Sequence, residues 1–104
     1  MKWHDATKEF PEVIEWPGRY ITIDGKTEYK RVFSSTQVLI RFIDNTDERK
    51  DIGYSIGYWV GEPGNPKGDN EWQNQDSVPF EYRHEQPTHW CYFKDIPQPE
   101  ENKQ

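Results

Sequence analysis

Hydrophobic and polar residues alternate most regularly along residues 51–60 of the chain. A period of two over about ten residues predicts a β-strand. One face of this strand carries large apolar side chains and the other is mostly small, the two sets being Ile52, Tyr54, Ile56, Tyr58 and Val60, and Gly53, Ser55, Gly57 and Trp59. Glycine in a strand often marks the close approach of another group. We therefore expect either a large side chain, such as a tryptophan, lying across the glycine face, or a ligand shelf beside Trp59.

Further apolar segments precede this strand. Pro17-Gly18 predicts a turn. The segments 19–23 and 26–33 are rich in β-branched and aromatic residues, and Asp24-Gly25 separates them. Asp-Gly is a preferred two-residue hairpin turn because both of its residues need a positive φ angle, so these segments predict a β-hairpin. Residues 37–43 form the most apolar stretch, which is typical of a central strand covered on both faces.

The N-terminal segment is mostly polar but carries two aromatic residues. Residues 3–10 could form one helical turn, with Asp5 as its N-cap and Pro11 ending it. Trp3 and Phe10 would then anchor this segment to a sheet.

The second half of the chain contains a long polar segment. Residues 61–77 are rich in Gly, Pro, Asn, Asp and Gln and include one large apolar residue, Trp72. Such long loops are usually functional or disordered, so Trp72 either fills the core as a plug or remains available to a partner. Residues 78–83 predict a short strand, which Pro79 places at a sheet edge. Residues 88–93 predict the last strand.

Composition decides the fold class. Ile and Val together number 13, whereas Ala, Leu and Met together number 3. Helix formers are therefore scarce, and β-branched and aromatic residues favour strands. We predict a mainly β fold, α+β at most: a single antiparallel sheet of five to six strands, strongly twisted or half-closed, with one or two short helical turns. This domain would span residues 1–97, with a mobile tail over 98–104.

Charge and cysteine content limit the partners. The net charge is −6 and the pI about 5.0, which disfavours binding of duplex nucleic acid because such proteins present a basic face. One cysteine, Cys91, excludes an internal disulfide. No apolar run approaches the length of about 18 residues that a membrane helix needs. These features predict a cytoplasmic protein without a membrane partner.

Candidate catalytic and metal-binding side chains gather near the C-terminus. His84, Glu85, His89 and Cys91 lie within eight positions of one another. A zinc site needs about four such ligands, usually as two pairs at set spacings, and a second pair is missing here. A catalytic thiolate would need a neighbouring cation or helix N-terminus, and neither is evident. We predict no catalytic residue, metal or cofactor, and keep a small metal-dependent enzyme as an alternative.

Aromatic residues suggest a binding surface. The chain has 5 Trp, 6 Tyr and 5 Phe, and such rings stack on sugars, nucleobases and methylated amines. Because aliphatic residues are scarce, we expect most of these rings to form the core. Two or three rings left exposed would suffice for a site.

The order of several motifs resembles a known family. Three sets of motifs are similar, in this order, to those of the proteins grouped as domain of unknown function 551. They are the opening from Trp3 to Glu12, then Val38-Leu39-Ile40 followed by Gly53-Tyr54 or Gly57-Tyr58, and finally Thr88-His89-Trp90 followed by Pro97-Gln98-Pro99-Glu100. These proteins are common in phages, prophages and other mobile elements, so the resemblance implies a phage-associated accessory protein in a bacterial host cell. It implies no catalytic activity. In this arrangement Trp3 and Trp90 could pack together and join the two termini, which leaves His89 on the opposite face.

These observations lead to one functional hypothesis and two alternatives. We expect a non-catalytic phage or mobile-element accessory protein, monomer or homodimer, that binds a host protein or small ligand, with counter-defence as one possible role. The first alternative is a carbohydrate- or nucleotide-binding module that stacks its ligand on an exposed tryptophan. The second is the metal-dependent enzyme. The candidate contact residues are Tyr58, Trp59, Trp72 and His89.

Overall fold

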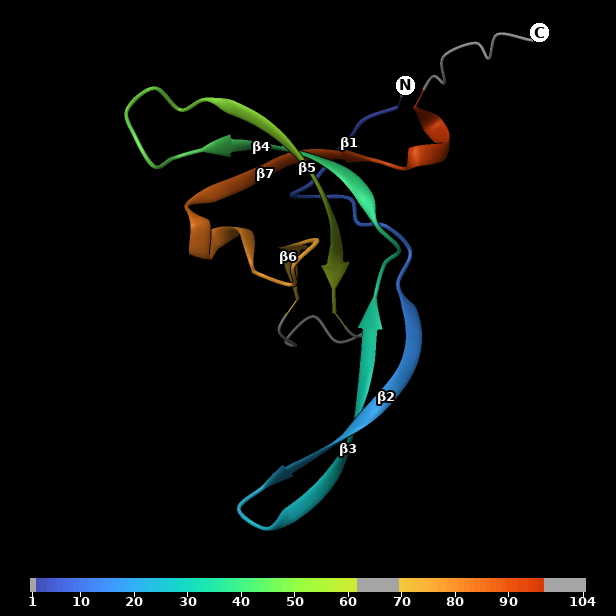
Figure 1. Cartoon of the computed structure of the whole chain (residues 1–104). Helices are drawn as coiled ribbons and strands as arrows, with labels where there is room; N and C mark the ends of the chain where they lie inside the picture. The colour runs from blue at the N-terminus through green and yellow to red at the C-terminus, as the bar shows by residue number, and fades with distance from the viewer. Residues whose placement is uncertain (1, 62–69, 97–104) are drawn as a thin grey trace, which may run out of the picture.

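The computed structural model describes residues 2–61 and 70–96, which form a mainly β domain (Figure 1). Over this part of the chain, one antiparallel sheet has seven strands, one more than the upper limit of the prediction. The additional strand arises because the short strands His4–Asp5 and Glu71–Asn74 were not predicted, whereas the strand predicted at 78–83 does not form. The elements are β1 (His4–Asp5), β2 (Ile14–Ile23), β3 (Lys26–Ser34), β4 (Val38–Asp44), β5 (Ile52–Val60), β6 (Glu71–Asn74), the 3-10 turn η1 (Phe80–Arg83), β7 (Glu85–Cys91) and the 3-10 turn η2 (Phe93–Asp95).

The strand order brings the two ends of the domain together. The order is β1-β7-β4-β5-β3-β2, and β6 pairs with β5 off this path. The predicted central strand, β4, lies between β7 and β5. Its residues Val38, Ile40 and Phe42 are buried on one face, whereas the residues between them are only half-buried. The second face of β4 is therefore less covered than predicted.

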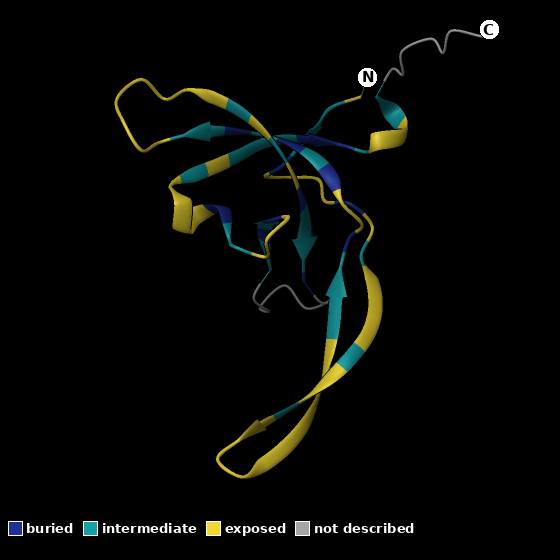
Figure 2. Cartoon of the chain, viewed as in Figure 1, coloured by how far each residue is buried: buried dark blue, intermediate teal, exposed yellow. Residues whose placement is uncertain are grey.

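The predicted hairpin forms an arm that projects from the sheet. Asp24 and Gly25 connect β2 to β3 with φ angles of 51° and 76°, which confirms the two-residue turn. Figure 1 shows the arm extending away from the other strands, and Ser34 opposite Val60 is the pair that links β3 to β5. Most of the arm is exposed (Figure 2).

The turn predicted at Pro17-Gly18 is instead an irregularity within β2. The β2–β3 register shifts between Trp16 and Arg19. The backbone N–H of Gly18 donates a hydrogen bond to the Tyr29 hydroxyl at 3.0 Å. A side chain at Gly18 would lie 2.5 Å from the Tyr29 ring, so glycine allows this ring to cross the strand.

The glycine face of β5 is the inner face of the sheet. A methyl group at Gly53 would lie 2.5 Å from the Phe42 ring, and one at Gly57 would lie 2.7 Å from Ile40. The prediction that a large side chain lies across this face is therefore confirmed, with phenylalanine in place of tryptophan. The consequence is that the apolar face of β5 points outward, and Tyr54 is 60% exposed.

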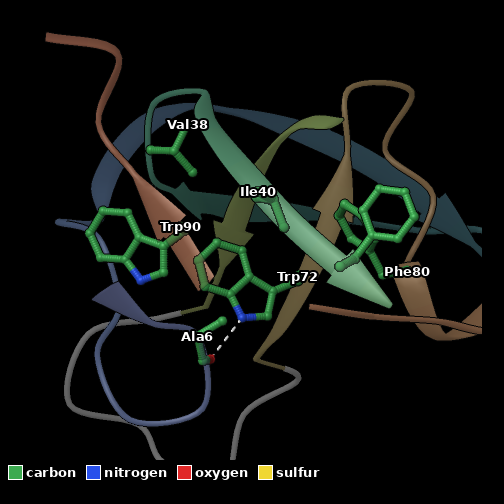
Figure 3. Close-up of a cluster of buried hydrophobic side chains, with 7 residues drawn as sticks. Ala6, Val38, Ile40, Trp72, Phe80 and Trp90 are labelled. Carbon is green, nitrogen blue, oxygen red and sulfur yellow. Dashed lines mark hydrogen bonds between the residues drawn. The ribbon is translucent and has the colours of Figure 1, made fainter. Parts of the chain in front are cut away.

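The core is a small cluster on this inner face. Figure 3 shows residues from β4, β6, η1, β7 and the N-terminal turn meeting there, and the cluster comprises Ala6, Val38, Ile40, Phe42, Trp72, Phe80 and Trp90. Four aromatic side chains, Phe42, Trp72, Phe80 and Trp90, are buried, whereas seven are exposed. The expectation that most aromatic rings form the core is wrong, because the arm and the outer sheet face carry many of them.

The N-terminal segment joins the sheet through a different aromatic contact from the one predicted. His4 pairs with Trp90 and Asp5 with His89, so the termini are joined, but the His4 ring stacks on Trp90 at a centroid distance of 4.3 Å. Trp3 contacts Tyr54 and His89 instead. The predicted Trp3–Trp90 contact is wrong because neighbouring residues of a strand point to opposite faces.

Three local predictions also change. The predicted helical turn at 3–10 is a strand followed by a hydrogen-bonded turn, although Asp5 caps it as expected by accepting a hydrogen bond from the Thr7 N–H at 2.8 Å. The polar segment 61–77 contains a strand, β6, in which Trp72 pairs with Trp59 of β5. The strand predicted at 78–83 is η1. The predicted tail, 98–104, and residues 62–69 lie outside the described residues.

Candidate functional site

A cavity of about 580 Å³ opens on the inner side of the sheet. The residues around it come from the N-terminal turn, the loop after β4, β5, β6, η1 and the start of β7. The volume lies within the range of about 300–1,000 Å³ that is usual for small-molecule sites. The cavity is the candidate functional site.

Aromatic side chains line the cavity. Trp59 and Trp72 are opposite each other in the β5–β6 pair, and their rings lie 5.1 Å apart at an angle of 61°. Phe80 is placed beside them by η1, which follows Pro79. Phe10 stacks on Trp59 at a centroid distance of 4.1 Å and an angle of 18°, so its ring covers this side of the indole.

Charged and polar side chains complete the lining. Glu81 and Glu85 contribute carboxylates, and Glu71, His84 and the amide residues Asn45, Asn70 and Gln86 also line the cavity. The Glu71 carboxylate itself accepts a hydrogen bond from the Gln73 side chain, on the same face of β6. Neither lysine nor arginine occurs among the described lining residues. The cavity therefore combines apolar rings with a negative charge.

Glu85 is more enclosed than Glu81, which is exposed. Its side chain is 14% exposed, and the Arg83 Nε lies 3.6 Å from its Oε1. Burial raises the pKa of Glu85 above the usual value, with Asp44 acting in the same direction, although the Arg83 guanidinium opposes the shift. The left-handed conformation of His84, with φ of 57°, ends η1 and leads the chain into β7 at this position.

The four contact residues predicted from the sequence occupy three different places. Trp59 and Trp72 meet in the cavity. Tyr58 points away from it, and its hydroxyl forms a hydrogen bond with the Ser77 hydroxyl. His89 pairs with Arg41 in the β4–β7 register and contacts Trp3. Only the two tryptophans therefore belong to one site.

Sequence reasoning missed most of the cavity. It did not identify Phe80, Glu71 or Glu81 as site residues, and it considered Glu85 only beside a possible metal site. The alternation of β5 placed Trp59 on the glycine face, and this signal was correct. Phe80 and Glu81 come from a turn, whose side-chain directions no periodic pattern reveals, and Glu71 and Glu85 begin strands that the sequence pattern did not mark at these positions.

The residues proposed for metal binding are not brought together. Across residues 2–61 and 70–96, no group of three or more His, Cys, Asp or Glu side chains is arranged to hold a metal ion. His84 lines the cavity, whereas His89 contacts Trp3 on the other side of the sheet. The geometry of the described residues therefore gives the metal-dependent alternative no support.

Cys91 is the residue that a catalytic thiolate would require, and its reactivity can be tested directly. Its side chain is fully buried, and burial raises the pKa of its thiol, with Asp95 adding to this effect. Because the thiolate is the reactive form, we expect Cys91 not to react with a disulfide reagent at pH 7 in the folded protein. In denaturant it should react at the rate of a free thiol, and rapid labelling of the folded protein would contradict this prediction.

The comparisons with known proteins give no family for this chain. No family model, no curated protein and no solved structure matches it. In the part of the chain that the structure describes, no helix is long and apolar enough to span a membrane.

Proposed function

We propose that this protein is a non-catalytic binding protein that holds its ligand in the aromatic cavity. The observation that carries the proposal is the convergence of Trp59, Trp72 and Phe80 around about 580 Å³ of accessible space. Ligand sites are typically concave and lined mainly by apolar and aromatic side chains, with a few polar groups that orient the ligand. The cavity has each of these properties.

The position of the tryptophans distinguishes this proposal from the carbohydrate- or nucleotide-binding alternative. That alternative places the ligand on an exposed tryptophan, but Trp72 is buried and Trp59 is half-buried beneath Phe10. A sugar or base would stack on Trp59 only after Phe10 had moved. A ligand that enters the cavity beside these rings needs no such displacement. The proposed association with phages or mobile elements, the role in counter-defence and the cytoplasmic location stay predictions.

The proposal is tested by the indole N–H signals of the tryptophans in NMR spectra. A set of small cationic, neutral and anionic probes is titrated separately into the full chain. We expect at least one probe to shift the signals of Trp59 and Trp72, because both rings line the cavity. Trp16 lies on the β2–β3 arm and donates its indole N–H to the Ser34 carbonyl, so it is the internal control.

The cavity variant Trp59→Phe keeps an aromatic ring but reduces the ligand contact. It should weaken binding of an active probe several-fold, whereas Trp16→Phe should not. If no probe shifts Trp59 and Trp72, or if Trp16 responds equally, the proposed function is wrong.

A further inference from the structure

The electrostatic character of the cavity limits the class of ligand. Two carboxylates line it, from Glu81 and Glu85, and no lysine or arginine stands among its described lining residues. Charges of one sign in a recess with low-dielectric walls concentrate ions of the opposite sign. An anionic ligand would meet repulsion, whereas a cation would be attracted.

The aromatic walls favour a particular kind of cation. Trp59, Trp72, Phe80 and the exposed ring of Phe10 line the cavity, and aromatic rings attract positive charge through their quadrupoles. A primary ammonium group is strongly hydrated and carries three N–H donors, which only the carboxylate and amide oxygens of the lining, and not its rings, can accept. A methylated ammonium carries its charge on an apolar surface, so it loses less hydration when it contacts the rings.

The arrangement of the carboxylates agrees with such a ligand. Across the described residues, no three His, Cys, Asp or Glu side chains are arranged to hold a metal ion. The two carboxylates instead come from separate elements: Glu81 from η1 and Glu85 from β7. An organic cation is stabilised by the combined field of such groups and needs no direct ligation by all of them.

Glu85 is the carboxylate best placed to strengthen this interaction. Its side chain is 14% exposed, and its ion pair with Arg83 is long, at 3.6 Å, with Arg83 itself 58% exposed. A partly desolvated carboxylate gains more from a neighbouring cation than an exposed one does, because water screens the interaction less. Glu85 therefore retains the capacity to interact with a second cation from the cavity side.

We infer that the cavity binds a methylated ammonium group, held against the aromatic side chains that line it and near the carboxylates of Glu81 and Glu85. This inference rests on the proposed function and names the chemical class of its ligand. The group can belong to a free small molecule or to a methylated lysine side chain, since both present the same cation to the cavity.

The test compares choline with 3,3-dimethylbutan-1-ol, which has the same shape without the charge. Binding is measured on the full chain from the indole signals of Trp59 and Trp72 at low ionic strength. We expect choline to bind about tenfold more tightly than the neutral alcohol, because the alcohol gains neither the cation–π nor the carboxylate interaction. Raising the ionic strength from about 0.01 M to about 0.15 M should weaken choline binding.

Two cavity variants and one control locate the effect. Glu85→Gln and Glu81→Gln each retain the shape of the side chain and should weaken choline binding several-fold with little change for the neutral alcohol. Glu28→Gln changes an exposed carboxylate on the arm and should leave both affinities unchanged. Because Glu81 is exposed, its variant tests the inference even if Glu85→Gln lowers the melting temperature.

The outcomes separate this inference from the proposed function. Equal binding of choline and the neutral alcohol, or binding of an anionic probe alone, would overturn the methylated ammonium while leaving a functional cavity. If no probe binds, both the inference and the proposed function are wrong. A short peptide carrying trimethyllysine identifies the source: tighter binding than choline assigns the group to a protein side chain, and equal or weaker binding assigns it to a free molecule.

Discussion

Replacing Trp90 with alanine is expected to lower the free energy of unfolding by about 3–5 kcal/mol, the usual cost of removing a large aromatic side chain from a core. Trp90 is 2% exposed. Its ring lies against His4 at 4.3 Å and Tyr92 at 4.9 Å. Its indole N–H also donates to the Glu9 carbonyl at 2.8 Å. The substitution therefore leaves a cavity and removes two contacts with the N-terminal segment.

Urea denaturation followed by circular dichroism measures this effect. Because a small domain is stable by only about 5–15 kcal/mol, the variant should unfold at a clearly lower urea concentration or be partly unfolded without urea. Trp90→Phe should lose less, since it retains a ring but not the hydrogen bond. Trp16→Ala on the exposed arm is the matched control and should change stability far less. Equal losses for Trp90→Ala and Trp16→Ala would contradict the assignment of Trp90 to the core.

The sequence predicted the strands of this fold better than their orientation. The Asp24-Gly25 hairpin was predictable because its turn requires two positive φ angles, which few residue pairs adopt readily. The alternation along 51–60 identified β5, but alternation marks two faces without stating which one is buried. Hydrophobicity alone favours the face with Ile52 and Tyr54, whereas the structure buries the glycine face because Phe42 and Phe80 approach it.

The candidate site was predictable from two features: the alternation along β5 and the single large apolar residue of segment 61–77, Trp72. Trp59 follows the period of β5, and its face was identified correctly. Tyr58 was predicted as a contact residue, yet it points away from the cavity because adjacent strand residues point in opposite directions. Phe80 and Glu81 belong to a 3-10 turn that was predicted as a strand. Their approach to Trp59 depends on long-range packing, which no local pattern encodes.

The two roles considered for Trp72 from the sequence can now be separated by mutation. Trp72 is 8% exposed and belongs to the core cluster. Its indole N–H donates to the Ala6 carbonyl at 3.1 Å (Figure 3). Trp72 therefore fills the core as a plug, while part of its ring lines the cavity. We expect Trp72→Ala to lower the free energy of unfolding by about 3–5 kcal/mol, measured by urea denaturation.

This expected loss determines how binding by Trp72 variants is interpreted. Lost binding in Trp72→Ala would not identify a contact residue, because the same substitution disturbs Ala6 and the N-terminal turn that borders the cavity. Trp59→Ala is the matched comparison, since Trp59 is half-buried and packs against the core cluster without belonging to it. It should be less destabilising than Trp72→Ala at a similar cost in ligand affinity. If Trp72→Ala instead unfolds at the same urea concentration as the unmodified chain, Trp72 is a surface contact and not a core residue.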